Sequence, residues 1–496
     1  MRTLSGAALS LIMLTQVIAE AAATPEVKAM LEEIRAENEL PALGGLAIVD
    51  GEVKAIGAVG LRKFKGKEKV TAADKWHIGS CTKSMTATLA ATFVEEGKLN
   101  WDSTISEVLG GEVRMRDEYK DVTLKTLLTN RSGIPSNAPL GTRIKAAADS
   151  GKRDIEKRRK QYAEGLLKLK PEFEPGTKYG YSNSGFVVAG VMLETISGRS
   201  WEELMQERIF KPLKMQSAGF GAAAARRKED QPWGHTSKTK PRPPGPGDDN
   251  PDVIGPAGTV HCSLADLARY VKMHLDHEVG PVLKKPESFV RLQTIADGND
   301  DYACGWVIAD RAWANGPALW HNGSNTMNYC LIWMAPGRKF AAIAVTNVDP
   351  ESGGKPCDAV VGKFIEHYLA GGGAKGGAGS RADAGRKVSP FSGVRWEGDE
   401  PVVKIGLEWF KLVSLDGIAA GDIVAFSQRR FDSKWQMRFA EDLVDVLDGM
   451  DHHPENNTVE LVVQELDSPN RQTLNGVAMT KANRDAIRAA RRAAGE

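Results

Sequence analysis

The 496-residue chain has almost no net charge, since 65 Lys and Arg stand against 64 Asp and Glu. This balance gives no electrostatic reason to expect nucleic acid as a partner. The hydrophobic content of 42% is too high for a largely disordered chain and is enough for a sizeable core. At about 150 residues per domain, the length gives roughly three domains as a first estimate.

Cysteine is also scarce, with only five residues and no pair spaced as in a zinc or redox motif. An odd number leaves at least one thiol unpaired. We therefore expect buried thiols rather than a disulfide framework, at Cys81, Cys262, Cys304, Cys330 and Cys357.

Long apolar runs are missing after the first 23 residues. Arg2 precedes a mostly apolar run over 4–19, and small residues follow to Ala23. These three parts predict a cleaved signal peptide over 1–23, with a retained N-terminal anchor as the alternative. No later stretch approaches the roughly 20 apolar residues of a membrane span. We expect a soluble mature protein that is periplasmic or secreted.

One segment lacks any hydrophobic period, the glycine-rich stretch over 371–386. Its composition is typical of a flexible linker. The sequence therefore predicts a large domain over 24–370, a linker over 371–389 and a small domain over 390–496.

Turn signals at both ends of the large domain predict hairpins. Asp50-Gly51 separates apolar runs over 46–49 and 53–59, and Pro336-Gly337 separates runs over 329–334 and 340–347. Helical patterns lie between them and before them, at 26–38, 80–99, 185–196 and 264–274. Strands from both ends with helices between predict an α+β domain, an antiparallel sheet covered by helices.

The small domain is predicted to be α+β as well, without a catalytic constellation. We expect two or three strands over 402–426, a helix over 435–447, a strand over 458–466 and a basic helix after Thr480. His452-His453 is expected to be an exposed turn. The domain is either an interaction module that binds a protein partner or a structural appendage.

Two stretches of the large domain are predicted to lie on the surface. The segment 143–170 is basic around 157–160 and is typical of a solvated helix face. The segment 238–251 is rich in proline and is typical of a surface loop.

A Ser-x-x-Lys pattern places a hydroxyl and an amine on one helix face, where the lysine can take the serine proton. The pattern begins at Ser80, Ser237 and Ser352. The second lies in the proline-rich loop, and the third has glycines where a helix must form. Only the first is followed by a mostly apolar helix, which favours Ser80 and Lys83 and places the serine at a helix N-terminus.

Two further patterns are weak when taken alone. Tyr181-x-Asn183 could supply a proton relay, if lysine lowers the tyrosine pKa, and a substrate amide contact. His321-x-Gly323 could let a substrate backbone approach a strand edge, with histidine supplying a hydrogen bond or a positive charge. The alternative interpretation of the first pattern is a turn capped by asparagine. The second pattern is not specific, because it occurs again at His77-x-Gly79.

Order and spacing of the three motifs together resemble those of the penicillin-recognising serine hydrolases. The chain is most similar to the class C β-lactamase and D-alanyl-D-alanine carboxypeptidase family, which includes esterases. Further landmarks occur in the family order, at 76–80, 127–135, 174–176, 256–258 and 264–267. The resemblance covers roughly 25–370 and implies an antiparallel sheet flanked by helices, with an all-helical lobe.

The resemblance implies an acyl-enzyme mechanism that needs no metal and no cofactor. Ser80 would be the nucleophile, and Lys83 and Tyr181 would transfer protons. Asn183 would contact the substrate and the lysine, and the strand at His321 and Gly323 would dock the substrate. The backbone amides of Ser80 and Ser324 would form the oxyanion hole.

Departures from the family pattern bear on the substrate. Lysine usually begins the third motif of the β-lactamases, whereas His321 is more similar to the carboxypeptidase and esterase members. Trp76 replaces phenylalanine, Asn130-Arg131 replaces His-Thr, and Cys81, a packed small residue, follows the nucleophile.

We expect a serine hydrolase acting on a small-molecule or peptide amide or ester, with peptidoglycan-derived compounds among the candidates. The alternatives are a β-lactamase and, from another class, a non-catalytic binding or receptor protein on the same fold.

Overall fold

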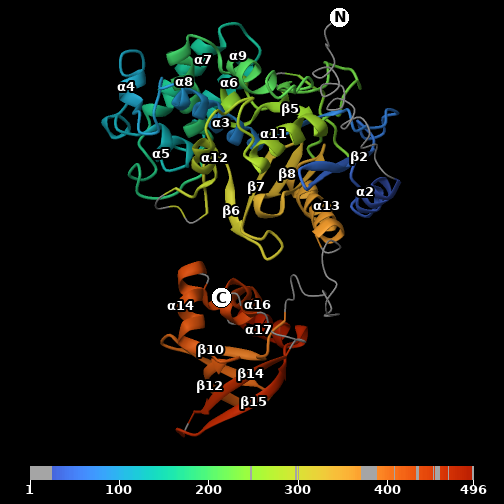
Figure 1. Cartoon of the computed structure of the whole chain (residues 1–496), viewed down its shortest axis with the longest axis vertical. Coiled ribbons are helices and arrows are strands. Elements are labelled where there is room, and N and C mark those ends of the chain that lie inside the picture. Colours follow the sequence, from blue (N-terminus) through green and yellow to red (C-terminus); the bar gives the residue numbers. More distant parts are fainter. Residues whose placement is uncertain are drawn as a thin grey trace, which may run out of the picture. The chain divides into compact units, whose positions relative to one another are not determined.

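The computed structural model describes residues 25–245, 248–296, 299, 301–369, 388–406, 408–431, 435–450, 452, 458–466 and 468–493. They form two compact units, which meet in sequence between Gly373 and Ala374 (Figure 1). The predicted signal peptide and most of the predicted linker lie outside the described residues. Within those residues, no helix has the length and apolar character of a membrane span.

A six-stranded antiparallel sheet is built from both ends of the first unit, as predicted. Its order is β2-β1-β9-β8-β7-β6. The strands are β1 (Ala42–Val49), β2 (Glu52–Gly60), β6 (Val307–Asp310), β7 (Pro317–Ser324), β8 (Tyr329–Ala335) and β9 (Phe340–Thr346). Both predicted hairpins are confirmed, since β1 pairs with β2 and β8 with β9.

Side chains that alternate along these strands supply two cores. Leu43 and Ala344 face the helices α2 (Pro25–Glu37) and α13 (Pro350–Leu369). Ile343 and Val345 belong to the larger core, which α11 (Leu264–Asp276) shares. The sheet is therefore buried on both faces.

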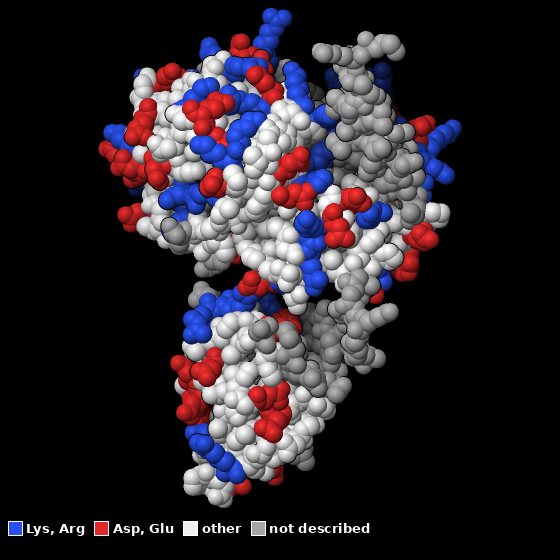
Figure 2. All heavy atoms as spheres, in the orientation of Figure 1, with Lys and Arg blue, Asp and Glu red and all other residues white. Residues whose placement is uncertain are grey.

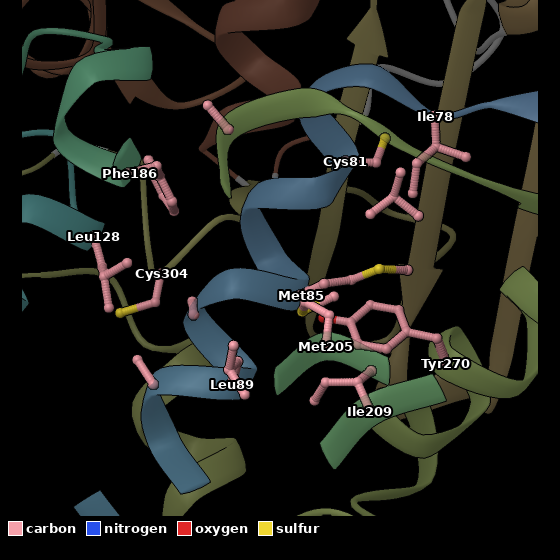
Figure 3. Packing of buried hydrophobic residues seen from close by; sticks show 14 of the residues in the cluster. Ile78, Cys81, Met85, Leu89, Leu128, Phe186, Met205, Ile209, Tyr270 and Cys304 are labelled. Atoms are coloured by element: carbon pink, nitrogen blue, oxygen red, sulfur yellow. The ribbon is translucent and has the colours of Figure 1, made fainter. Parts of the chain in front are cut away.

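A helical lobe lies beside this sheet and is centred on α3 (Thr82–Glu95) (Figure 1). Every residue from Thr82 to Phe93 is buried, so this part of α3 has no solvent-exposed face. Figure 3 shows Met85 of α3 beside Tyr270 of α11. The other helices of the lobe are α4 (Ile105–Leu109), α5 (Leu124–Leu128), α6 (Leu140–Asp149), α7 (Ile155–Leu167), α8 (Asn183–Ser197) and α9 (Trp201–Met205).

A second, three-stranded sheet lies next to the start of α3. Its order is β3-β5-β4, with β3 (Lys75–His77), β5 (Val260–Ser263) and β4 (Gly219–Phe220). A short helix, α10 (Gly255–Gly258), leads into β5. A further helix, α12 (Pro286–Gln293), contacts α3.

The second unit is an antiparallel sheet packed with helices, so the small α+β domain is confirmed. The sheet order is β10-β11-β12-β14-β15. The strands are β10 (Gly393–Glu397), β11 (Glu400–Ile405), β12 (Glu408–Leu415), β13 (Ile418–Ala419), which pairs with β12, β14 (Thr458–Glu465) and β15 (Arg471–Ala478). The helices are α14 (Ala420–Phe431), α15 (Trp435–Glu441), α16 (Leu443–Gly449) and α17 (Lys481–Ala493).

Two predictions for this unit are wrong in part. Residues 420–426 belong to α14 rather than to a strand, because Ala420, Ile423, Val424 and Ser427 are buried at helical spacing. The helix expected over 435–447 is two helices, separated at Asp442, whose backbone is not helical.

The prediction for His452 is also wrong. Its side chain is half-buried and Nε2 lies 2.8 Å from Oδ2 of Asp416, so this histidine does not sit in an exposed turn. His453 lies outside the described residues.

The expected solvated helix face over 143–170 is wrong within its basic cluster, at Arg158 and Arg159. Arg159 of α7 is fully buried and pairs with Glu194 and Glu202. Its neighbour Arg158 pairs with Asp252 and is only 14% exposed. Elsewhere acidic and basic side chains are interspersed over the face of this unit in Figure 2.

All five cysteines are buried free thiols, as predicted. Cys81 is 1% exposed, and its thiol donates to the carbonyl of His321 at 3.5 Å. It is therefore the packed small residue that the sequence predicts.

Candidate active site

Ser80 lies on a 3₁₀ turn (Gly79–Cys81) that runs directly into α3. Gly79 has a φ of +50°, which a side chain would disfavour. A Cβ built on Gly79 would lie 2.1 Å from the amide nitrogen of Ser324. Glycine is thus required where the serine turn meets the end of β7.

Lys83 lies one helical turn after Ser80 and is fully buried. Its Nζ lies 2.7 Å from Oδ1 of Asn183, 2.9 Å from the carbonyl of Ala257 and 3.1 Å from Oγ of Ser80. A neutral amine has two N–H groups and one lone pair. If the two carbonyl oxygens accept both hydrogens, the lone pair faces the serine hydroxyl.

The environment of Lys83 favours this neutral form. Burial lowers the pKa of Lys83 to about 7, because an ammonium loses its hydration in the interior. A substantial fraction of the amine is then free to accept a proton at neutral pH.

Tyr181 also contacts Ser80, and its ring centroid lies 4.8 Å from Nζ of Lys83. Its hydroxyl is 2.7 Å from Oγ of Ser80, while 37% of the residue is exposed. Burial of the hydroxyl end raises the pKa of Tyr181 to about 12. The structure therefore opposes the expectation that lysine makes this tyrosine more acidic, since a buried neutral amine supplies no stabilising charge.

Asn183 is the first residue of α8, and the Ser182 side chain caps that helix by accepting from the amide of Gly185. This cap fixes the N-terminal end of α8 and with it the position of the Asn183 side chain. The side chain reaches Lys83, as the sequence predicts. The structure thus brings together Ser80, Lys83, Tyr181 and Asn183.

Gly323 and Ser324 form the end of β7 against the serine turn. A Cβ on Gly323 would lie 2.0 Å from the carbonyl of Ile78 and 2.5 Å from the amide nitrogen of Ser80. The amides of Ser80 and Ser324 therefore lie close together across this contact, where an oxyanion hole requires two donors.

His321 lies at the site but its ring is already engaged by the protein. Nδ1 is 2.5 Å from the carbonyl of Asn322, and Nε2 is 3.4 Å from the hydroxyl of Tyr302. The ring is buried, with its centroid 6.5 Å from that of Tyr181. In this structure neither nitrogen is turned toward an open docking edge.

Asn130 is a positioning group that the sequence analysis left without a role. It is fully buried with a φ of +58°, which asparagine tolerates better than most residues. Its Oδ1 accepts from the amide of Ser182 and its carbonyl from the amide of Gly180. Asn130 thus holds the chain on both sides of Tyr181. In the sequence, the only signal of this role was that Asn130-Arg131 replaces the His-Thr of the family pattern.

His77 and Asp249 form a buried pair behind the serine turn, with Nε2 3.2 Å from Oδ1. Asp249 belongs to the segment 238–251, so the surface-loop prediction is wrong at this position. A lone aspartate in a proline-rich stretch gives no sequence signal of burial.

The other two Ser-x-x-Lys patterns take no part in this site. Ser237 lies in a loop, as predicted. Ser352 lies in α13, so the argument that its glycines prevent a helix is wrong. Tertiary packing of α13 on the sheet overrides their low helix propensity, since Gly353 is buried against Thr346 and Val348.

Comparison with known proteins agrees with this geometry. A family model described as Beta-lactamase matches residues 27–362. The chain belongs to the beta-lactamase family. Members of this family are mostly serine hydrolases, of β-lactamase, penicillin-binding-protein and amidohydrolase type.

Two proteins similar to this member of the beta-lactamase family have low sequence identity to it. Penicillin-binding protein 4 of Amycolatopsis lactamdurans is 27% identical over 329 residues, which are 64% of this chain and 83% of the relative. A D-stereospecific amidohydrolase structure from Streptomyces sp. has a TM-score of 0.53 at 23% identity, covering 70% of this chain and 99% of that one.

An octameric penicillin-binding protein homologue from Pyrococcus abyssi shares the fold over more of the chain. Its TM-score is 0.55 at 20% identity, with 90% of this chain and 95% of that one covered. Because the first unit ends at Gly373, this match extends into the second unit.

No group of three or more His, Cys, Asp or Glu side chains that could hold a metal ion occurs among the described residues.

Proposed function

We propose that this protein is an exported serine hydrolase that cleaves an amide or ester through an acyl-enzyme on Ser80, of the D-alanyl-D-alanine carboxypeptidase or esterase type. The observation that carries the proposal is the position of Ser80 Oγ, between Lys83 Nζ at 3.1 Å and Tyr181 OH at 2.7 Å. A hydroxyl between a neutral amine and a phenol has both a base and a proton donor at hand.

The proposed reaction has two stages. Lys83 takes the Ser80 proton as Oγ attacks the carbonyl carbon, and the amides of Ser80 and Ser324 stabilise the oxyanion. The proton reaches the leaving amine or alcohol through the hydroxyl of Tyr181. A water molecule then attacks the ester on Ser80, with the same groups moving its proton in the reverse direction.

The similar proteins support the class of bond that is cleaved. A penicillin-binding protein and a D-stereospecific amidohydrolase both point to peptide-like amides. His321 in place of the lysine usual in β-lactamases disfavours efficient β-lactam hydrolysis. We therefore rank β-lactamase activity second.

The test is covalent labelling of the purified mature protein with a fluorophosphonate and, separately, with a fluorescent penicillin. The expected result is an adduct on Ser80, located by mass spectrometry and absent from Ser80→Ala. Hydrolysis assays with a D-alanyl-D-alanine peptide, a p-nitrophenyl ester and a chromogenic cephalosporin then rank the three activities. A folded protein that gives no adduct with either reagent would favour the non-catalytic binding protein.

A further inference from the structure

A buried carboxylate lies between the two segments that would carry the oxyanion-hole amides. The Asp249 side chain is only 3% exposed, and its Oδ1 lies 3.2 Å from His77 Nε2. The same oxygen accepts a hydrogen bond of 2.7 Å from Nδ2 of Asn325. His77 precedes the serine turn, and Asn325 directly follows Ser324.

His77 transmits this contact to the serine turn. Its Nδ1 accepts a hydrogen bond of 3.1 Å from the amide of Gly79, the residue before Ser80. An accepting Nδ1 carries no proton, so the ring proton of the neutral tautomer is on Nε2, facing Asp249. The carboxylate therefore favours the tautomer that holds the Gly79 amide.

Asn325 transmits the contact to the end of β7. Besides donating to Asp249, it accepts from the amide of Met327 and from Nδ2 of Asn328 through Oδ1. Both the nitrogen and the oxygen of the Asn325 side-chain amide are therefore hydrogen-bonded, which fixes the chain just after Ser324.

The charge on Asp249 suits this arrangement. Burial raises the pKa of Asp249, but His77, Asn325 and the amide of Asn250 outweigh it, and the net pKa lies below the ordinary value. The residue is ionised at neutral pH and accepts hydrogen bonds only.

We propose that Asp249 is a positioning residue that aligns both amides of the oxyanion hole, through His77 on the Gly79–Ser80 turn and through Asn325 on the end of β7. This inference rests on the proposed function. It assigns a role to a proline-rich segment that contributes no group to the reaction itself. Oxyanion stabilisation depends on donors fixed before the reaction, so small displacements of these amides reduce kcat.

The experiment compares Asp249→Asn, His77→Ala and His77→Asn in the full mature protein. In His77→Asn, the side-chain oxygen of asparagine occupies the place of Nδ1. This variant therefore retains the acceptor for the Gly79 amide and loses only the contact with Asp249. Asp252→Asn is the matched control, because Asp252 lies in the next part of the chain and pairs with Arg158 instead.

With p-nitrophenyl acetate as the probe, we expect kcat of Asp249→Asn and His77→Ala to fall about 10- to 100-fold, less than the 10²–10³-fold of losing one oxyanion donor. KM should be unchanged, His77→Asn should recover part of the loss, and Asp252→Asn should match the wild type. The proposal would be overturned if kcat and KM changed by the same factor. It would also be overturned if His77→Asn recovered none of the kcat lost in His77→Ala.

Amide hydrogen exchange supplies a readout that does not need activity. Peptides covering 77–81 and 323–327 should exchange faster in Asp249→Asn and His77→Ala, with the α3 core unchanged. Unchanged exchange in both peptides of a folded variant contradicts the proposal. Failure of the proposed function would give a different result, namely no Ser80 adduct in the wild type. In that case the exchange data would still decide whether Asp249 fixes the two segments.

Discussion

Lys83 donates a hydrogen bond of 2.7 Å to Oδ1 of Asn183, a residue one hundred positions later in the chain. With the carbonyl of Ala257 at 2.9 Å, this contact accounts for both hydrogens of a neutral amine. Three segments distant in sequence therefore fix the orientation of one lone pair. The pH dependence of Ser80 acylation should depend on that arrangement.

The rate of Ser80 acylation should depend on pH through Lys83. Because the pKa of Lys83 is about 7, the amine is protonated and inactive below that pH and becomes an acceptor as the pH rises. The second-order rate of fluorophosphonate labelling should increase between pH 5 and 9 with a midpoint near 7. A flat profile would contradict Lys83 as the base.

Asn183→Asp should move this midpoint upward. A carboxylate in place of the amide stabilises the ammonium form of Lys83 and raises its pKa. Labelling at pH 7 should slow, with the rate recovering at higher pH. An Asn183→Ala variant is the control, since it removes the contact without adding charge and should give no upward shift of comparable size.

Tyr181→Phe should lower the turnover of esters and amides without loss of stability. In the proposed mechanism the hydroxyl supplies a proton to the leaving group, and loss of general acid catalysis costs typically about 10²–10⁴-fold. Because Tyr181 is 37% exposed, the thermal midpoint should hardly change. The pH profile should retain its rise near 7, because that rise belongs to Lys83; its disappearance would assign the titration to the tyrosine.

Cys81→Ala should leave labelling of Ser80 intact. The residue is 1% exposed, and its thiol donates to the carbonyl of His321. Iodoacetamide should not inactivate the native protein, measured as residual labelling by the fluorophosphonate. Inactivation that Cys81→Ala prevents would show that this thiol is reactive.

Arg159→Met should destabilise the first unit strongly. Removing one partner leaves Glu194 buried without its guanidinium, and breaking a buried ion pair costs about 3–5 kcal/mol. Urea unfolding should show this loss, whereas Lys157→Met on the exposed part of α7 should unfold like the wild type. Equal stability of the two variants would contradict a structural role for the Arg159 network.

Local signals in the sequence were sufficient for much of the fold. Asp50-Gly51 and Pro336-Gly337 predicted both hairpins, because tight turns favour such residues. Residues 420–426 were misassigned, because a short apolar run fits a strand and a buried helix equally well. Burial at 420, 423, 424 and 427 becomes visible only once the neighbouring strands are in place.

For the site, the sequence by itself determined the types and order of the candidate groups, Ser80, Lys83, Tyr181 and Asn183, because the order and spacing of local motifs can be read along the chain. Only the tertiary structure decided their state. The low pKa of Lys83 comes from burial among distant segments, and the sequence analysis assigned no role to Asn130, His77 or Asp249. Desolvation and hydrogen-bond direction depend on which atoms surround a group in space, and adjacent sequence does not specify them.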